Sequence, residues 1–505
     1  MLTKMKKNII ILIIIALLTK SIGFIKQMAL AYLFGASSIS DAYLISITIP
    51  SVIFGFIGMT IVAGYIPKYN FIKNDKDEVD ADEFTSNMTN ILFVIVTIIV
   101  SLVYFFSDNV VMLFASGFDE STLEIASKFT RISIFSLYAI YVSSIFTAYI
   151  QIKNNIVVPA LLEIPTNIMV LFFIFLGSKF NILMLPIGFL LAMTINGIMI
   201  YTYARFKKYK HKFIFNIHDK NIQSLTLISG PLMVGISVNQ INILIDRTIA
   251  SQVSIGGISA LNYASTLNGL IQGGFVMSVI TAMYPIMATK AANDDFDGLN
   301  NITVKSINLI SLLLVPASFG IIIFSKEIIY LLFGRGAFDK NALIITSSAL
   351  TYYSIGMLSV GLRDVLSRFY FAINDVITPV KSALYGLTLN IILNLLLSKV
   401  MGIGGIALAT SISASVTLFL LLINKKSKIM NIYNRELLIN HLKIIIASIL
   451  MSICAKIFFS YMSFLNSKNI ELLLSIMVAI CIYLILVVLF KVEGIKNVNR
   501  FFVRK

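Results

Sequence analysis

The sequence predicts an all-α integral membrane protein with fourteen transmembrane helices, arranged as two parallel-repeat lobes of six helices and a C-terminal helix pair. Three observations predict this class: the composition, the spacing of the apolar segments and an internal repeat. Of the 505 residues, 58% are hydrophobic and only 13% are charged, and the mean hydropathy is +0.91. Because a soluble core has no room for so much apolar surface, the bilayer must be the solvent for most of the chain.

Fourteen apolar segments each come close to the roughly twenty residues that a helix needs to cross a hydrocarbon core. The first follows Lys4, Lys6 and Lys7 as a signal peptide would, but it has no small-residue cleavage site, so we expect it to be retained. The expected spans are 8–34, 41–66, 87–106, 128–151, 156–177, 181–204, 222–250, 258–288, 302–324, 342–370, 378–398, 402–423, 439–462 and 470–490.

The chain repeats itself at an offset of 218 to 220 residues. Such internal duplication is common in transporters. Because six expected crossings separate the copies, the halves share one orientation, and a cavity between them is the natural place for substrate. The lobes are expected at 1–219 and 220–424, with the last helix pair and a tail at 425–505. The matching pairs are Ala42 with Ala260, Pro67 with Pro285, Phe106-Ser107 with Phe324-Ser325, Phe118-Asp119 with Phe338-Asp339, and Pro159 with Pro379.

The formal net charge of +16 comes from lysines and arginines concentrated on alternate connections. By the positive-inside rule this asymmetry places both termini in the cytoplasm, and an even number of spans agrees. The basic balance is therefore a matter of topology and of contact with membrane lipids, and it requires no nucleic acid partner. The basic connections hold Lys4, Lys6 and Lys7; Lys68, Lys73 and Lys76; Arg205, Lys207, Lys208, Lys210 and Lys212; Lys425, Lys426, Lys428 and Arg435; and Lys491, Lys496, Arg500, Arg504 and Lys505.

The connections carry no set of residues that would perform catalysis. There is no phosphate-binding glycine loop, no Ser/His/Asp set and no Cys/His cluster with metal-ligand spacing, and the three histidines all fall in polar connections. The two cysteines, Cys454 and Cys481, lie in apolar runs and favour packing over a disulfide. The sequence therefore favours a transporter over an enzyme or an inert scaffold, with no cofactor beyond a coupling ion.

Charged residues inside the expected spans are functional candidates, because each costs roughly 2.5–3.5 kcal/mol at a helix centre. Lys26 lies deep in the first span, where its side chain reaches the interface with difficulty, so we favour a role in the cavity. Asp364 and Arg368, four residues apart, are expected to neutralise each other. The predicted substrate-binding residues are Lys20, Lys26, Asp41 and Arg363.

A second group is rich in oxygen atoms and suits a small hard cation. Asn390 and Asn394 lie one helical turn apart, and Thr410 and Asp246 are expected at a similar depth in their own spans. A hard cation is bound by a carboxylate together with neutral oxygens. The alternative is that these amides and hydroxyls join helices by hydrogen bonds. The two readings stay open on the residues alone.

The residues resemble the MurJ/MviN family of lipid II flippases, and the resemblance covers the first twelve spans in order. It implies the multidrug/oligosaccharidyl-lipid/polysaccharide exporter fold, alternating access, and an undecaprenyl-diphosphate-linked peptidoglycan precursor as substrate. It also implies a bacterial cytoplasmic membrane, sodium at Asp246, Asn390, Asn394 and Thr410 or else a proton as coupling ion, and cell-wall synthesis enzymes as partners. The motifs are Gly23-Phe24-x-Lys26, Leu33-Phe34-Gly35-Ala36, Asp41-Ala42-Tyr43, Ile49-Pro50, Ile66-Pro67, Gly117-Phe118-Asp119 with Thr130-Arg131, Phe333-Gly334-Arg335-Gly336-Ala337-Phe338, Arg363-Asp364-x-x-Ser367-Arg368 and Asn374-Asp375-x-x-Thr378-Pro379.

The sequence departs from the family pattern at the cavity arginines. Lys26 takes the place of the first arginine, which keeps the charge but loses the bidentate fork. Phe54 and Thr266 take the places of two others. A flippase for another polyprenyl-linked glycan is therefore a second hypothesis, and a drug or cation antiporter of the same fold is a weaker third.

Overall fold

The structure, a computed structural model, describes residues 2–153, 155, 157–424, 435–462 and 467–493. These residues form fifteen helices and no strand. Ten of the described helices are long and apolar enough to cross a membrane, and a bent helix pair makes up to eleven. The prediction of an all-α membrane protein is confirmed. The basic connection at Lys425, Lys426 and Lys428 and the tail residues Lys496, Arg500, Arg504 and Lys505 lie outside the described residues.

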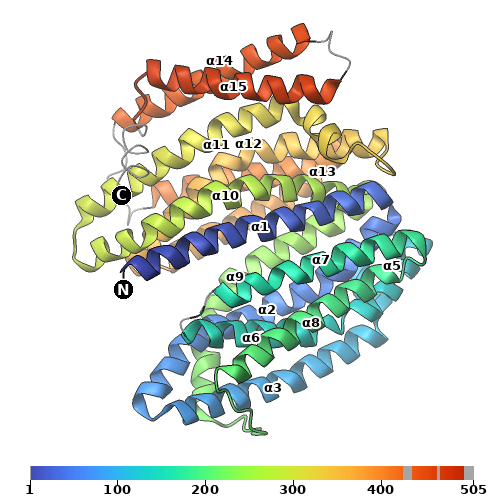
Figure 1. Ribbon diagram of the computed structural model, residues 1–505, viewed down its shortest axis with the longest axis vertical. Coiled ribbons are helices and arrows are strands. Elements are labelled where there is room, and N and C mark those ends of the chain that lie inside the picture. The colour runs from blue at the N-terminus through green and yellow to red at the C-terminus, as the bar shows by residue number, and fades with distance from the viewer. Residues whose placement is uncertain (1, 154, 156, 425–434, 463–466, 494–505) are drawn as a thin grey trace. The chain divides into compact units, whose positions relative to one another are not determined.

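The first of two compact units comprises residues 1–259 and 336–338. Within it α1 packs against α7, α7 against α8, and α8 against α6, while α2 contacts α5, α6 and α9 (Figure 1). Because α2 has neighbours on several sides, side chains such as Tyr43 and Ile45 are fully buried. The helices are α1 (Leu2–Phe34), α2 (Ser38–Asp75), α3 (Glu78–Phe105), α4 (Ser107–Phe114), α5 (Glu120–Ser133), α6 (Ser136–Ile152), α7 (Val157–Lys179), α8 (Met184–Phe206) and α9 (Lys220–Val253).

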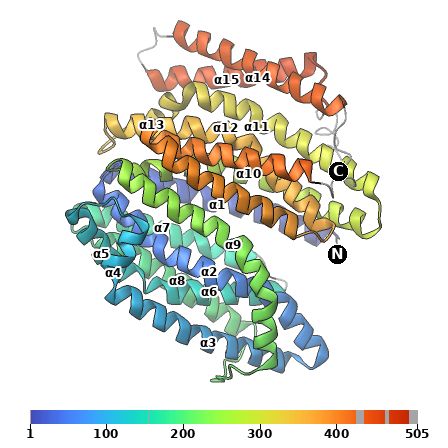
Figure 2. The same ribbon diagram turned by 180° about the vertical axis from the view of Figure 1, so that it is seen from behind.

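The second unit comprises residues 260–335 and 339–505. In it α12 packs against α11 and α13, and α11 also contacts α14, which pairs with α15 (Figure 2). The long helix α13 breaks at Gly402, whose φ of 58° is a conformation that glycine adopts without steric cost. The helices are α10 (Gly257–Ala292), which begins in the first unit, α11 (Phe296–Phe333), α12 (Lys340–Ala372), α13 (Ile377–Ile423), α14 (Arg435–Tyr461) and α15 (Lys468–Leu489).

The internal repeat is also visible in the positions at which helices begin. Asp77 is the N-cap of α3 and Asp295 is the N-cap of α11, and each carboxylate accepts a backbone N–H three residues ahead at 2.8 Å. Asp339 accepts the Ala342 N–H in the same way at the start of α12, whereas Asp119, which precedes α5, accepts from the Ser121 and Thr122 hydroxyls. An aspartate at this position satisfies an N–H group that has no partner within the helix. The duplicated sequence therefore starts corresponding helices at corresponding residues.

The predicted boundary between lobes after residue 219 is not tested by these contacts. The compact units divide instead near Ser259, because α9 packs against α2 of the first unit. The lobe assignment concerns the ancestry of the two halves, whereas the units describe which helices touch. It stays a prediction.

Candidate functional site

Lys26, a cation within the first expected span, has a neutral partner on a neighbouring helix. Its Nζ donates to Asn167 Oδ1 on α7 at 3.0 Å. The contact follows from the packing of α1 against α7. Among the described residues no carboxylate forms an ion pair with Lys26, so its charge meets only a neutral amide oxygen. A cation held in this way in a membrane segment has unused capacity for an anion.

Two more charged side chains belong to the same pair of helices. Lys20 lies on α1 six residues before Lys26 and is exposed. Glu163 lies on α7 one turn before Asn167, is exposed, and its backbone carbonyl accepts from Asn167 Nδ2 at 3.1 Å. Asn167 was missed from the sequence. The signal was present, because it is an amide inside an otherwise apolar segment.

Asp41 occupies a very different environment from Lys26. Its side chain is 1% exposed. Oδ2 accepts from the Gly256 N–H at 2.9 Å, and Oδ1 accepts from the Ser259 N–H at 2.7 Å and from the Ser259 hydroxyl. These N–H groups lie at the start of α10, so Asp41 of α2 caps a second helix from outside.

This junction joins the two copies of the repeat. Asp41 and Ser259 are separated by 218 residues, the offset of the duplication. Gly256 has a φ of +76°, and a Cβ there would lie 2.3 Å from the Ala36 carbonyl oxygen. The close approach of the two turns therefore depends on glycine at 256. These contacts give Asp41 a structural role, and its predicted contact with substrate stays a prediction.

Arg363 lies on α12 and pairs with its neighbour. Its NH2 group is 3.1 Å from Asp364 Oδ1, and both side chains are about one-third exposed. Arg368 instead lies over the ring of Tyr284, 5.5 Å from its centre. The expected pairing of Asp364 with Arg368 was therefore wrong: the adjacent guanidinium takes the carboxylate, and Arg368 finds aromatic faces.

Three of the four residues predicted to bind a cation lie together in α13. Asn394 Nδ2 donates to Asn390 Oδ1 at 2.8 Å, and Asn390 Nδ2 lies 3.4 Å from Thr410 Oγ1. The helix break at Gly402 lets the two segments of α13 pack side by side, so Thr410 faces the asparagines. Both asparagines are buried. Asp246 lies on α9 in the first unit, where Asn242 Nδ2 donates to it at 3.3 Å.

The chemistry of these side chains suits sodium better than a transition metal. Amide and hydroxyl oxygens are ligands for hard cations. Among the described residues no group of three or more His, Cys, Asp or Glu side chains gathers as softer or multivalent metals would require. The donor set is therefore compatible with the predicted ion.

Uncharged side chains, Phe54 and Thr266, occupy the two positions at which the family pattern has arginine. Phe54 on α2 is 7% exposed. Thr266 on α10 donates its hydroxyl to the Asn262 carbonyl of its own helix at 2.7 Å. Neither supplies a cation in place of the arginine.

Comparison with solved structures gives the fold. The structure titled "Lipid II flippase MurJ, inward closed conformation" matches with a TM-score of 0.83 at 27% identity, covering 98% of this chain and 100% of that one. An inward-facing multidrug resistance transporter of the MATE family matches with a TM-score of 0.70 at 13% identity, over 83% of this chain and 98% of that one. The second likeness shows a shared fold alone.

Comparison with known sequences gives the family. A protein from Thermosipho africanus named "Lipid II flippase MurJ" is 29% identical over 472 residues, which is 92% of this chain and 93% of that protein. A "Probable lipid II flippase MurJ" from Thermotoga maritima is 29% identical over 398 residues, 77% of this chain and 79% of that one. The resemblance drawn from the motifs is confirmed. Because the family model described as "Lipid II flippase MurJ" matches residues 30–495, nearly the whole length, the chain belongs to the MurJ family of lipid II flippases.

Proposed function

We propose that this protein moves lipid II, the undecaprenyl-diphosphate-linked peptidoglycan precursor, from the inner to the outer face of the cytoplasmic membrane by alternating access. The observation that carries the proposal is the family match over residues 30–495. That family consists of transporters, so the protein is not an enzyme. Cell-wall synthesis enzymes, which make and use such precursors, are the proposed partners.

The contact between Lys26 and Asn167 supports a role in holding the diphosphate. An amide oxygen is a weaker partner for an ammonium group than a diphosphate oxygen is, because the second interaction joins two charges. A substrate headgroup therefore gains by taking the place of the amide of Asn167. Lys20, exposed on the same helix, and Arg363 are the further predicted contacts.

The proposed topology has fourteen spans with both termini in the cytoplasm. Counting α13 as two spans on either side of Gly402, α5 with α6 as one, and α1 and α9 as spans brings the ten apolar helices to fourteen. A cytoplasm-negative potential then favours moving an anion outward by roughly 2.3 kcal/mol per charge per 100 mV.

A flippase for a different polyprenyl-linked glycan is the second candidate. The observation in its favour is the uncharged pair Phe54 and Thr266 at positions of family arginines. Fewer cations weaken the grip on a diphosphate and shift discrimination toward other parts of the substrate. The two candidates share fold and mechanism and differ only in cargo.

Depletion of the protein in its own cell tests which glycan is moved. We expect lipid II to accumulate and the cells to lyse, as measured by mass spectrometry of extracted lipid-linked intermediates. Accumulation of another polyprenyl-linked glycan in cells that keep growing would move the assignment to the second candidate. A drug-exporter depletion strain, in which neither lipid accumulates, is the control.

We also propose that Asp246, Asn390, Asn394 and Thr410 hold a sodium ion that resets the transporter. The expected result is greater thermal stability of the purified protein in NaCl than in KCl at equal ionic strength, because an ion that binds only the folded state stabilises it. Thr410→Val removes one oxygen ligand without changing the shape of the side chain, and it should abolish the sodium-specific difference.

Thr417→Val is the matched control on the same helix. Its hydroxyl donates to the Ser413 carbonyl at 2.8 Å, much as that of Thr410 donates to the Ile406 carbonyl at 3.1 Å. This variant should keep the difference between the two salts. Equal stability of the unmodified protein in NaCl and KCl would contradict the sodium site.

A further inference from the structure

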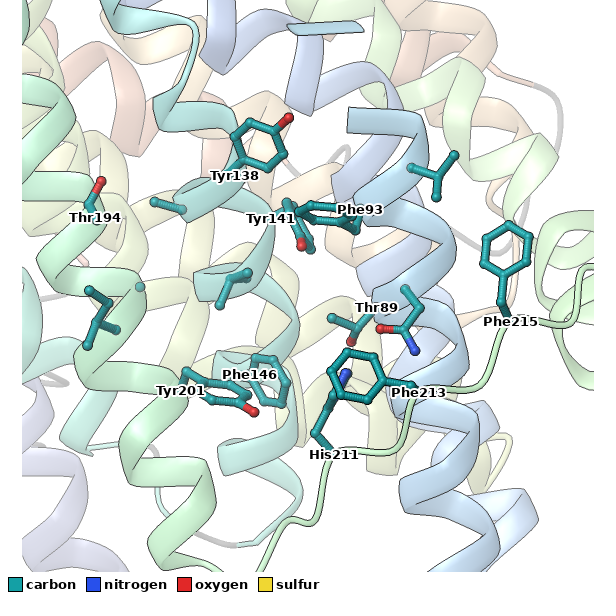
Figure 3. Close-up of a pocket in the computed structure, with 16 residues that line it drawn as sticks. Thr89, Phe93, Tyr138, Tyr141, Phe146, Thr194, Tyr201, His211, Phe213 and Phe215 are labelled. Atoms are coloured by element: carbon teal, nitrogen blue, oxygen red, sulfur yellow. The ribbon is translucent and has the colours of Figure 1, made fainter. Parts of the chain in front are cut away.

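A large aromatic cavity lies in the first unit, and none of the residues that line it belongs to the predicted substrate or cation sites. Its volume is about 710 Å³, within the roughly 300–1,000 Å³ of pockets that bind organic ligands. Helices α3, α6 and α8 form its walls, and the connection after α8 crosses its edge (Figure 3). Its lining is dominated by rings, among them Phe93, Tyr138, Phe146, Tyr201 and Phe213. The proposed transport mechanism does not use this cavity.

The connection at the edge of the cavity is held in place by hydrogen bonds to α3. Asn87 and Asn216 bond reciprocally: Asn87 Nδ2 donates to the Asn216 carbonyl at 2.9 Å, and the Asn216 N–H donates to Asn87 Oδ1 at 2.8 Å. Asn90 Nδ2 donates to the carbonyls of Lys212 and Ile214 at 3.1 and 2.8 Å. The rim is therefore a built structure rather than a chance arrangement of side chains.

Tyr209 fastens the start of this connection to the wall. It is 1% exposed, and its hydroxyl lies 2.9 Å from Ser86 Oγ and 3.0 Å from His211 Nδ1. Its ring packs edge-on against Phe146, with the centres 5.0 Å apart. Burial and the nearby positive charge of Arg205 lower the pKa of His211, so its neutral form is favoured at the rim.

The connection after α8 carries basic side chains in its first half and aromatic side chains where it crosses the edge of the cavity. Phe213 is 96% exposed and Phe215 is 54% exposed, although both line the cavity. In a membrane protein, exposed rings next to lysines are typical of a segment at the boundary between hydrocarbon and headgroups. The exposed cations along this stretch are Arg205, Lys207, Lys208, Lys210 and Lys212, and Lys212 forms an ion pair with Glu83.

We propose that this cavity, which we call the α3–α8 pocket, binds an anionic phospholipid, with a hydrocarbon chain among the aromatic rings and the phosphate headgroup at the lysines of the rim. The juxtaposition of an apolar cavity with a basic rim is complementary to such a lipid at both ends. A zwitterionic lipid gains the apolar contacts but little from the cations. A substrate with a polyprenyl chain also combines an apolar chain with a phosphate group. The experiment therefore distinguishes a phospholipid from a polyprenyl-linked substrate.

The sequence contains no tryptophan, so a single introduced tryptophan reports on its own surroundings. The full chain carrying Phe213→Trp is reconstituted in phosphatidylcholine vesicles that contain increasing fractions of phosphatidylglycerol with brominated chains. Half-maximal quenching should require roughly tenfold less brominated phosphatidylglycerol than brominated phosphatidylcholine, given the attraction of a few lysines to an anionic lipid. Equal requirements would overturn the proposal.

Phe172→Trp is the matched reporter, because Phe172 is a 57% exposed ring on α7 outside the pocket. It should show no preference between the two brominated lipids. A preference of the same size at both reporters would mean a general enrichment of anionic lipid around the protein and would also overturn the pocket.

Four double variants, all in the Phe213→Trp background, test the basic rim and the apolar cavity separately, each with its own control. Lys207→Gln with Lys210→Gln should remove most of the preference for phosphatidylglycerol, whereas Lys425→Gln with Lys428→Gln should keep it. Val142→Phe with Thr194→Phe fills the pocket and should remove the quenching by brominated phosphatidylglycerol. The control is Leu191→Phe with Ile195→Phe, which lie on the same helix as Thr194 but outside the lining. This double variant should leave the quenching unchanged.

Undecaprenyl diphosphate as competitor decides between the two sources of the ligand. It should leave the quenching by brominated phosphatidylglycerol unchanged at equal mole fraction. Displacement would assign the pocket to the polyprenyl chain of a substrate and overturn the phospholipid. Because no transport is measured, the result is independent of the proposed function.

Discussion

Lys26→Ala is expected to abolish rescue of cells depleted of the protein, whereas Lys26→Arg should retain it. Alanine removes the charge-assisted hydrogen bonds that Lys26 would offer a diphosphate, worth about 1.5–3 kcal/mol or roughly a tenfold to hundredfold loss of affinity. Arginine keeps the charge and adds a fork that matches phosphate oxygens. The measurements are colony formation after depletion and the amount of lipid II retained inside the cell.

The same substitution should not weaken the fold. Lys26 meets only the Asn167 amide among the described residues, and an unpaired charge in a membrane segment is a cost. We therefore expect Lys26→Ala to be as stable as the unmodified protein or more so. Lys425→Ala, which removes a charge from a predicted cytoplasmic connection, is the control and should rescue normally. Equal rescue by the two alanine variants would refute the binding role of Lys26.

Asp41→Ala is expected to lower the free energy of unfolding by about 3 kcal/mol. The substitution leaves the N–H groups of Gly256 and Ser259 buried without an acceptor, and each unsatisfied buried group costs about 1–3 kcal/mol. The start of α10 also loses the negative charge that favours a helix N-terminus. Unfolding of the purified protein in mixed micelles by a denaturing detergent measures the loss.

Asp108→Ala is the matched control for Asp41→Ala. Asp108 lies 3.6 Å from Arg131 with its side chain 59% exposed, and exposed ion pairs contribute less than about 1 kcal/mol. This variant should unfold nearly as the unmodified protein does. If Asp41→Ala kept full stability but lost transport, Asp41 would be a substrate contact, as the sequence predicted, and the structural role would be refuted.

Much of the fold was predictable because the membrane imposes a strong constraint on composition. Backbone polar groups have no partner in hydrocarbon except one another, so apolar segments of sufficient length become helices. The repeat also survived as sequence, and the aspartates at 77 and 295 that start α3 and α11 differ by its offset. The expected span 128–151 is bent in the structure: it corresponds to α5 and α6, which meet at an angle of 45°.

The site was predictable only in part. Asn390 and Asn394 share a helix face, so their contact followed from spacing alone. The partners of Lys26, Asp41 and Asp364 could not be predicted from spacing along the chain. Asn167 lies 141 residues from Lys26, and Ser259 lies 218 residues from Asp41. Asp364 forms its ion pair with the adjacent Arg363 and not with Arg368, one helical turn away.

The sequence by itself determined that the chain is a membrane transporter of duplicated design, because hydropathy, charge asymmetry and repeat are properties of the chain read along its length. The tertiary structure alone decided that Lys26 faces an amide, that Asp41 caps the second copy of the repeat, and that α3, α6 and α8 line an aromatic pocket. Each of these depends on which helices pack together. That choice is made by side-chain shape and hydrogen bonding between segments far apart in the chain, in a solvent whose apolarity does not distinguish one apolar helix face from another.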